Sequence, residues 1–492
     1  MTDAVVVGAG PNGLAAALVL ARAGMTVTVL EEQDTPGGGS RTLDLGLAPG
    51  IVHDICSAVH PMAWASPFLR ELDIELLTPE ISYAQPLPGG RAGIAYRSLD
   101  RTVDALGADG PVWRRTVGRL SARAGRLAEL ALGDLTRLPE AVARSVARSV
   151  VARREVGAGD LALLAGLGAR AAAAGTLLRP GTERVLGFRG DVAPALLAGV
   201  ATHAITPLPS IPASSVALLL AALAHGRGGW PVPRGGSRAV VDALLTALAA
   251  LGVEIVTGHR VTTRADLPPA RAYLFDTAPE VPAAVFGDRM PRAVRRRLAA
   301  PARRGAAAKV DFALSGPVPW AVPEVARAGT VHLSGTLADI ARAEADVAAG
   351  RHAGRPVCLV SDPTVVDPGR AHDGLRPLWA YAHVPLGSGR DVTRDVTSQI
   401  ERFAPGFRDV VVASRCVPAA HMARHDGALV GGDILGGALT LPRLVLGPAR
   451  LRDPYATGVD GVWLCSSSTP PGPGVHGLCG VHAARRVLER LG

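Results

Sequence analysis

Residues Asp3–Glu32 decide the fold, and they read DAVVVGAGPNGLAAALVLARAGMTVTVLEE. The apolar run Ala4–Val7 predicts a buried parallel strand, and the Ala- and Leu-rich run Leu14–Ala23 predicts a helix. Gly24 ends this helix, and Thr26–Leu30 predicts a second strand. A strand, a glycine-rich turn, a helix and a second strand in this order form a βαβ unit of the kind that binds dinucleotides.

Each glycine of the turn has a physical role in this interpretation. Gly8 allows the tight turn from strand to helix, Gly10 lets the backbone approach a pyrophosphate, and Gly13 lets the helix pack closely on the strands. The helix N-terminus offers unpaired N–H groups to the phosphates. Glu31 follows the second strand, where its carboxylate can accept hydrogen bonds from ribose hydroxyls. Because a carboxylate here disfavours a 2′-phosphate, we expect FAD or NAD rather than NADP.

Length and composition limit the class of protein. A chain of 492 residues is expected to form two domains, and its 48% hydrophobic content is enough for a core. No stretch reaches the roughly 18 uninterrupted apolar residues of a membrane-spanning helix, and the N-terminus shows no secretion signal. The five cysteines are widely spaced without a CxxC pair. This spacing favours a reducing cytoplasm and argues against a disulfide framework, a metal site or a redox dithiol.

The net charge of +9 comes almost entirely from arginine. Arginine-rich runs lie at Arg144–Arg154 and Arg292–Arg304, the second of which predicts an exposed helix. With only 4% aromatic residues and no recognised module, no nucleic acid partner is expected. Solvated helix faces explain the charge best. Attraction to an anionic membrane surface is the alternative, so we expect a cytoplasmic protein, either free or peripheral to a membrane.

The pattern changes in the middle of the chain. Short strands are predicted within Ile74–Tyr96, and a long helical region over Thr102–Leu178. Gly157–Gly168 resembles a second dinucleotide loop, but it lacks a preceding strand, so we expect no second dinucleotide. Ser210–Ala224 predicts an apolar helix that is buried or, alternatively, lines an apolar substrate tunnel.

Later segments predict further strands that belong to the first sheet. A helix over Arg238–Leu251 precedes strands at Val253–Thr257 and Ala272–Phe275, and near the C-terminus a strand at Gly461–Ser466 precedes a glycine-rich loop and the helix Leu478–Leu491. We therefore expect an α/β fold with two domains, the cofactor domain being discontinuous. The expected cofactor domain comprises residues 1–72, 228–295 and 452–492, and the expected substrate domain comprises residues 73–227 and 296–451.

Four further features are candidates for the site. Arg41, in the loop GGGSRT, could reach a phosphate. His60 is either near the cofactor or packed at a helix start, and the loop Gly431–Gly437 either is a surface loop or faces the cofactor. Lys309 is the only lysine in the chain and lies in a strand-like apolar stretch. It is either a residual surface lysine or one kept where a compact ammonium is needed.

Four motifs carry a resemblance to a known family. With GAGPNG followed by Glu31, the GGGSRT loop, PVPRGGS at residues 231–237 and LCSSSTPPGPGVHG at residues 464–477, the chain resembles FAD-dependent oxidoreductases of the phytoene (carotenoid) desaturase-like group. More narrowly, it resembles the branch that contains pyridine nucleotide-disulfide oxidoreductase domain-containing protein two. The resemblance implies a discontinuous Rossmann-type FAD-binding domain with an inserted α+β substrate domain, as in the amine oxidase superfamily.

The resemblance also assigns cofactor contacts residue by residue. It implies that Gly8, Gly10, Gly13 and Glu31 contact the pyrophosphate and the ribose, and that Gly38 and Arg41 belong to a second glycine motif. It also implies that Val261 contacts the adenine. The loop at the flavin ring would comprise Gly474, Val475, His476 and Gly477. In amine oxidases a strand similar to that of Lys309 carries a lysine that holds a water near flavin N5, whereas carotenoid desaturases generally lack it. Lys309 is therefore the catalytic candidate. None of the five tyrosines is clearly placed for the aromatic substrate cage of amine oxidases.

The expected activity follows from the cofactor, because the flavin carries the chemistry and the protein positions the substrate. A hydride from a substrate C–H would pass to flavin N5 and leave a C=C or C=N bond. The substrate is expected to be an apolar small molecule, and the electron acceptor oxygen, a quinone or a protein. The alternatives are an amine-type oxidase that releases hydrogen peroxide and a flavin-binding regulatory protein without turnover.

Overall fold

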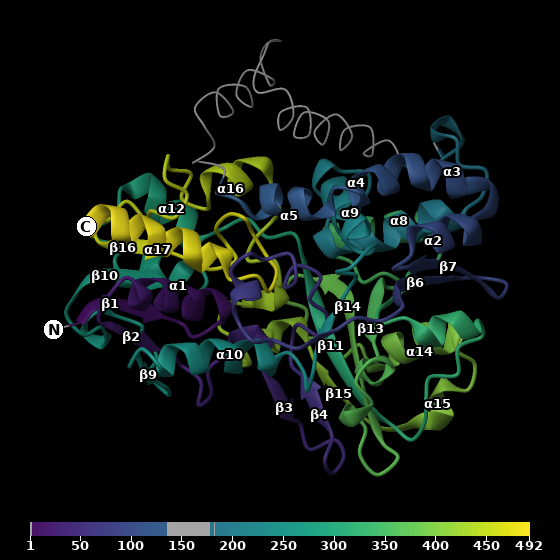
Figure 1. Cartoon of the computed structure of the whole chain (residues 1–492), viewed down its shortest axis with the longest axis horizontal. Helices are drawn as coiled ribbons and strands as arrows, with labels where there is room; N and C mark the ends of the chain where they lie inside the picture. Colours follow the sequence, from purple (N-terminus) through teal and green to yellow (C-terminus); the bar gives the residue numbers. More distant parts are fainter. Residues whose placement is uncertain (1, 135–177, 182) are drawn as a thin grey trace.

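The computed structural model of the chain describes residues 2–134, 178–181 and 183–492 (Figure 1). Its first sheet is parallel and has the order β16-β10-β1-β2-β9. The strands are β1 (Thr2–Val7), β2 (Val27–Leu30), β9 (Glu254–Val256), β10 (Ala270–Phe275) and β16 (Val462–Leu464). They come from three separated parts of the chain, so this Rossmann-type sheet is discontinuous, as expected.

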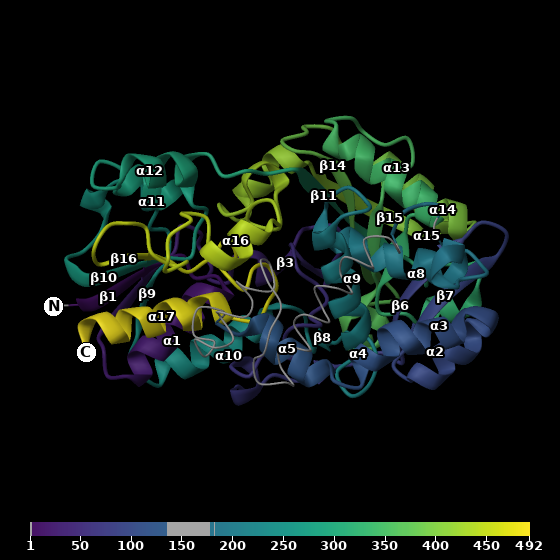
Figure 2. The ribbon, with the colours of Figure 1, turned by 90° about the horizontal axis from the view of Figure 1, so that it is seen from above.

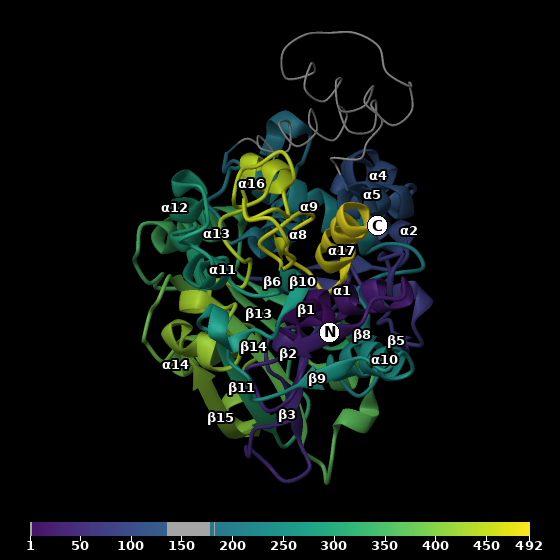
Figure 3. The same cartoon turned by 90° about the vertical axis from the view of Figure 1, so that its left-hand side faces the viewer.

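Helices cover both faces of the parallel sheet (Figure 2). These helices are α1 (Pro11–Arg22), α10 (Arg238–Ala249) and α17 (Leu478–Leu491) on one face, and α11 (Glu280–Val285) and α12 (Arg292–Ala299) on the other. Helix α1 packs between α10 and α17 (Figure 3). The alternation of β1 explains the arrangement: Ala4 and Val6 pack towards α1, whereas Val5 and Val7 pack in the cluster that includes α11 and α12.

Helix boundaries differ from the predicted ones where proline intervenes. Helix α1 begins at Pro11, three residues before the predicted start, because proline is well suited to the first helical position. The predicted exit helix Arg292–Arg304 ends at Ala299, since Pro301 follows and disfavours helical backbone in the residue before it. The predicted helix Ser210–Ala224 is confirmed as α9 (Ile211–Leu223), capped by the Ser210 side chain.

The second sheet has seven strands in the order β15-β11-β14-β13-β12-β6-β7 and is antiparallel except for the β12–β6 pair. Its strands are β6 (Ile81–Leu87), β7 (Arg91–Tyr96), β11 (Gly305–Leu314), β12 (Val331–Leu333), β13 (Cys358–Ser361), β14 (Arg376–Pro385) and β15 (Val411–Val417). Two small ribbons pair β3 (Thr42–Asp44) with β4 (Val52–Asp54) and β5 (Leu76–Leu77) with β8 (Val232–Pro233).

The two faces of the seven-stranded sheet differ in character because side chains alternate along each strand. One face is apolar; residues such as Val310, Phe312 and Ala380 pack there against α14 (Thr393–Phe403) and α15 (Phe407–Val410). The other face is here called the polar face. Its polar and aromatic residues include Tyr83, Gln85, Lys309, Asp311, His332, Trp379, Tyr381 and His383. Helices α8 (Val192–Ala201), α9 and α13 (Leu337–Ala348) lie on this side.

Of the predicted helical region Thr102–Leu178, the structure describes residues 102–134 and Leu178, which lies in a turn. The first of these parts is helical but broken into short pieces, α2 (Leu99–Ala105), α3 (Gly110–Trp113), α4 (Arg119–Ser121) and α5 (Ala124–Leu132). The rejected dinucleotide loop Gly157–Gly168 and the run Arg144–Arg154 lie outside the described residues. Among the described residues, the remaining α-helix is α16 (Leu441–Leu446). Among the described helices, none is long and apolar enough to cross a membrane.

Candidate cofactor and substrate site

A cavity of about 680 Å³ connects the parallel sheet with the polar face of the larger sheet. Its lining residues include the turn after β1, the ends of β2 and β10, and residues of strands β13 and β14. In doubly wound sheets, ligands bind at the carboxyl ends of the strands. The cavity therefore begins where a dinucleotide is expected and continues over the substrate side.

The glycines of the first turn form a cradle that only glycine fits. Gly8 has φ +98°, and a Cβ on Gly13 would lie 2.1 Å from the carbonyl oxygen of Gly8. A Cβ on Gly10 would lie 2.7 Å from Asp276 Oδ2. Gly8 and Gly13 thus provide the turn and the close packing that the sequence predicts, and Gly10 lines the cavity at the N-cap of α1. Their contact with a pyrophosphate stays a prediction.

Glu31 lies at the end of β2, buried at the wall of the cavity. Its Oε2 accepts a hydrogen bond from the Ala9 N–H at 2.7 Å, and its Oε1 accepts one from the Gln33 N–H at 2.9 Å. Burial raises the pKa of Glu31 despite these two hydrogen bonds. Val261 lines the same part of the cavity, so the two residues expected at the ribose and the adenine lie together.

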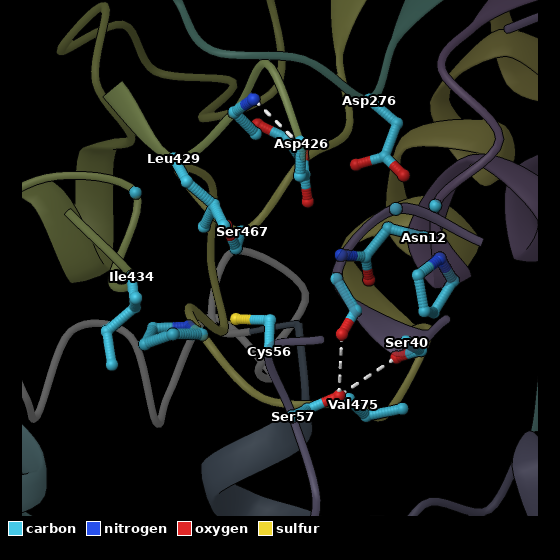
Figure 4. Close-up of a pocket in the computed structure, with 18 of the residues that line it drawn as sticks. Asn12, Ser40, Cys56, Ser57, Asp276, Asp426, Leu429, Ile434, Ser467 and Val475 are labelled. Atoms are coloured by element: carbon cyan, nitrogen blue, oxygen red, sulfur yellow. Dashed lines mark hydrogen bonds between the residues drawn. The ribbon is translucent and has the colours of Figure 1, made fainter. Parts of the chain in front are cut away.

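Asp276 is a site residue that sequence reasoning missed. It follows β10 directly, lines the cavity, and accepts a hydrogen bond through Oδ2 from the Gly13 N–H at 2.7 Å. Figure 4 shows its carboxylate directed towards Asn12 at the start of α1. Burial, with Asp426 and Glu31 nearby, raises the pKa of Asp276 to about 8. The available signal was its place, directly after a strand that pairs with β1.

The second glycine motif lies against the first. Gly38 lines the cavity, and a Cβ on it would lie 3.1 Å from Gly10 Cα. Arg41 is almost fully buried and donates hydrogen bonds to the carbonyl oxygens of Gly38 and His425. Arg41 is not among the lining residues of the cavity, so it fastens the motif to a neighbouring loop in this structure. Its contact with a phosphate stays a prediction.

The C-terminal loop closes one wall of the cavity. Gly474 and Val475 line it, whereas His476 and Gly477 lie behind them and shape the loop. His476 Nδ1 accepts a hydrogen bond from the Leu478 N–H at 3.0 Å, and its Nε2 contacts the Gly472 carbonyl oxygen at 3.1 Å. Burial lowers the pKa of His476 to about 4, which suits a neutral ring that caps α17. Its role as a flavin contact stays a prediction.

The middle of the cavity is lined by small polar side chains and by the late glycine loop. Ser57 Oγ donates a hydrogen bond to the Gly39 carbonyl oxygen at 3.1 Å and lies 3.2 Å from Ser40 Oγ (Figure 4). His60 lines the cavity and packs with Nε2 2.8 Å from Ser237 Oγ, and the residues after it form a turn instead of the helix considered from the sequence. Its place beside a cofactor stays a prediction. Residues 433–436 also line the cavity, so the loop faces the site.

Lys309 is buried one side chain behind the cavity wall. Its Nζ forms an ion pair with Asp311, which in turn lies 3.4 Å from His53 Nδ1. Lys309 Nζ lies 5.6 Å from the ring centroid of Trp379, and Trp379 lines the cavity. Burial opposes ionisation of Asp311, but Lys309 and His53 together hold its pKa below the ordinary value. The catalytic role of Lys309 stays a prediction.

The substrate side of the cavity is apolar and aromatic. The Trp379 and Tyr381 rings meet edge to face, 5.2 Å apart at 85°. Val216, Leu219 and Leu220 of α9 form another part of the lining, so α9 is both buried and cavity-lining. The sequence did not place any tyrosine at the substrate. The signal that could have placed Tyr381 is the alternation of Trp379, Tyr381 and His383 along β14.

Comparisons with known proteins agree with this architecture. Residues 6–72 match the model of a family described as NAD(P)-binding Rossmann-like domain. The chain is 26% identical, over 99% of its length and 94% of the relative, to pyridine nucleotide-disulfide oxidoreductase domain-containing protein 2 of Rattus norvegicus. These matches confirm the resemblance expected from the sequence.

Solved structures share the fold over nearly the whole chain. An oxidoreductase from Methanosarcina mazei aligns with a TM-score of 0.56 at 15% identity, covering 99% of this chain and 100% of that one. Cyclohexylamine oxidase from Brevibacterium oxydans aligns with a TM-score of 0.55 at 16% identity, covering 100% of this chain and 99% of that one. The fold class expected from the sequence is thereby confirmed.

Proposed function

We propose that the chain is an oxidoreductase that binds FAD and takes a hydride from a C–H bond of a mainly apolar substrate. The observation that carries the proposal is the continuity of one cavity, which joins the glycine cradle of the parallel sheet to the aromatic and aliphatic lining over the larger sheet. A cofactor in the cradle and a substrate over the polar face would share this space.

The residues present fit a flavin dinucleotide. The α1 N-terminus and Gly10 suit a pyrophosphate, Glu31 suits a ribose, and the backbone of Gly474 and Val475 suits the edge of a flavin ring. With a pKa of about 8, Asp276 is mostly uncharged near neutral pH, so it does not repel the phosphates. When bound, the flavin supplies hydride acceptance at N5.

The residues of the chain itself position the substrate and exclude water. The α9 side chains and the Trp379–Tyr381 pair present an apolar wall that favours hydrocarbon over charged groups. Lys309 is our candidate for holding a water beside the reacting atoms, because it is the only lysine of the chain and lies directly behind Trp379. The proposed electron acceptor is oxygen, a quinone or a protein, and the proposed location is the cytoplasm or a membrane surface.

An amine-type oxidase is the second candidate. The Trp379–Tyr381 pair and the buried Lys309 favour it, because an aromatic substrate wall and a strand lysine are the features that the resemblance to amine oxidases implies. Hydrogen peroxide released with simple aliphatic amines, but not with the corresponding alcohols or alkenes, would establish this candidate. A regulatory flavoprotein would instead bind FAD tightly without turnover. Changing Lys309 to Met together with Asp311 to Asn, which removes the buried ion pair as a unit, would leave its biological effect intact.

The first experiment is an absorption spectrum of the purified protein, followed by mass identification of the cofactor released on denaturation. Two visible flavin bands and release of FAD are expected. Anaerobic addition of candidate substrates should then bleach the flavin. A colourless protein that takes up no added FAD but binds NAD would overturn the proposal.

A further inference from the structure

A group of uncharged polar side chains lies where the cavity meets the polar face of the larger sheet. Thr330 directly precedes β12 and lines the cavity, and His203, in the short turn Thr202–Ala204 after α8, lines it as well. His332 lies on the same strand face as Thr330, and its Nε2 is 3.1 Å from His203 Nε2. The ring of Trp230, which also lines the cavity, lies edge-on to both histidines.

The hydroxyl of Thr330 is free to form a hydrogen bond with a group inside the cavity. Thr330 is only 1% exposed, and its Oγ1 has no hydrogen-bond partner among the described residues. His332 Nδ1 likewise has no partner within the described part of the chain. Buried polar atoms are normally hydrogen-bonded, because an unpaired one is costly. Thr330 combines this burial with a place in the cavity lining, so it marks the point where a polar group fits.

The polar side chains around Thr330 carry no formal charge. The cavity lining contributed by the larger sheet, α9 and the His203 turn contains, among the described residues, neither a carboxylate nor an ammonium nor a guanidinium group. Burial lowers the pKa of His203 to about 3 and holds that of His332 well below its ordinary value, with His383 adding to both effects. The histidine pair is therefore neutral, with one ring donating to the other.

The charged residues that line the cavity lie elsewhere. They come from the cofactor cradle and from the segments after β2, β9, β10 and β15, and include Glu31, Arg260, Asp276 and Asp426. Glu344, close to the polar face, is fully buried and contacts His383 Nδ1 at 2.5 Å. The two charged residues on the polar face itself, Lys309 and Asp311, form an ion pair with each other. A cationic or anionic substrate group at Thr330 would therefore lose its hydration without gaining a counter-charge.

We propose that the substrate is an elongated apolar molecule with one uncharged hydrogen-bonding group, a hydroxyl or a carbonyl, which Thr330 and the His203–His332 pair bind. A threonine hydroxyl can both donate and accept, and a neutral histidine pair can present either role by exchanging tautomers. The aliphatic wall of α9 accommodates the remainder of the molecule. The inference rests on the proposed function for calling this molecule a substrate, whereas its binding can be measured without turnover.

The test compares ten-carbon ligands that differ only in their polar group. Decan-1-ol, decan-2-one, decylamine and decanoate are titrated into the purified protein at pH 7.5, and binding is followed by tryptophan fluorescence, since Trp230 and Trp379 line the cavity. The alcohol and the ketone are expected to bind at least tenfold more tightly than the amine and the carboxylate. Equal or tighter binding of either charged ligand, or no binding of any ligand, would overturn the proposal.

Variants then locate the contact. Thr330→Val should weaken decan-1-ol binding about threefold to tenfold, the loss expected for one hydrogen bond, while Thr330→Ser keeps it. Binding of 1-chlorodecane should be unchanged in Thr330→Val; an equal loss for 1-chlorodecane would mean that the effect is structural and would contradict the proposal. Thr457→Val is the matched control, because that buried hydroxyl donates to the Val462 carbonyl oxygen at 2.9 Å and does not line the cavity.

A further variant tests the histidine pair. His203→Phe keeps an aromatic ring beside Trp230 but removes the nitrogen atoms. It should therefore weaken the binding of decan-1-ol and decan-2-one and leave the binding of 1-chlorodecane unchanged. Unchanged alcohol binding in both His203→Phe and Thr330→Val would overturn the proposal. If the alcohol binds as expected but no related compound bleaches the flavin, the proposed function fails while the binding preference stands.

Discussion

The carboxylate of Asp276 accepts a hydrogen bond from the backbone N–H of Gly13, at the helix end where a dinucleotide phosphate is expected. In this position Asp276 is compatible with an anionic cofactor only while it holds its proton. Burial and the neighbouring Asp426 and Glu31 keep it protonated up to a pH of about 8. Cofactor affinity and the protonation of Asp276 are therefore linked.

We expect flavin affinity to fall as the pH rises through about 8, and Asp276→Asn to remove most of this fall. Measuring the dissociation constant for FAD by fluorescence between pH 6.5 and 9.5 tests this. Asp288→Asn, at an exposed carboxylate paired with Arg264, is the control and should behave as the unmodified chain. The same pH dependence in Asp276→Asn would assign it to Glu31 or Asp426 instead.

The free energy of unfolding should also depend on the protonation of Asp276. The pKa of Asp276 is raised on folding from an ordinary value of 3.8, so its contribution to stability is fully present below pH 3.8 and is lost as the pH rises through about 8. Urea unfolding of the cofactor-free protein should therefore show lower stability at pH 9 than at pH 7. Asp276→Asn should reduce this difference.

Removing Lys309 leaves the buried carboxylate of Asp311 without its ion-pair partner. We expect Lys309→Met to lower the free energy of unfolding by about 3–5 kcal/mol, as is typical when one member of a buried pair is removed. The double variant Lys309→Met/Asp311→Asn should lose less than the sum of the two single variants. Urea titrations give the stabilities, and additive losses would show that the pair is not coupled.

The same double variant separates folding from chemistry at Lys309. If Lys309 holds a reactive water, flavin reduction stays slow even when stability is restored. If its role is only to neutralise Asp311, reduction recovers with stability. The lowered pKa of Asp311 also gives stability that is present above pH 3.8 and lost as the pH falls through the folded value, and the double variant should lack this loss.

Gly13→Ala should abolish cofactor binding and strongly destabilise the parallel sheet, since its Cβ would lie 2.1 Å from the Gly8 carbonyl oxygen. Gly125→Ala in α5 is the control, because a Cβ at that position would have no other atom within 4 Å. That substitution should add about 0.5–1 kcal/mol of stability through helix propensity. Flavin content after purification and thermal unfolding measure both effects, and normal flavin content in Gly13→Ala would contradict the cradle geometry.

Filling the substrate side should separate substrate binding from cofactor binding. Val216→Trp on α9 places a bulky ring in the cavity, so we expect at least a tenfold loss in the rate of flavin reduction with unchanged flavin content. Ile211→Trp on the same helix is the control, since Ile211 is 61% exposed. Loss of flavin in Val216→Trp would place the helix beside the cofactor and not beside the substrate.

Local sequence signals predicted the parts of the fold whose structure is determined locally. The βαβ unit, α9 and the closing strand and helix follow from short apolar runs, glycines and caps, and their bounds agree to within a few residues. Pro11 and Pro301 account for the largest shifts among the ends of these helices and of α12. The polar face was not predicted, because it joins strands from residues 81 to 417 whose pairing no local pattern reveals.

The candidate site likewise has residues that local sequence motifs predicted and residues that they did not. Gly8, Gly10, Glu31 and Val475 line the cavity because their motifs place them there. Asp276 and Tyr381 depend on long-range pairing, β10 with β1 and β14 with β13, so their neighbours could not be read from nearby sequence. His476 caps its own helix, a local role that a motif shared with flavoproteins does not distinguish from a flavin contact.

The three-part origin of the parallel sheet has a consequence for how the protein is made. Strand β16 and the loop at Gly474 are synthesised long after the glycine cradle, which lies near residue 10. A nascent or prematurely terminated chain ending before residue 462 therefore has a cradle with no opposite wall and a sheet with an exposed edge. Retention of the proposed flavin is therefore expected only after the residues up to the loop at Gly474 have been synthesised.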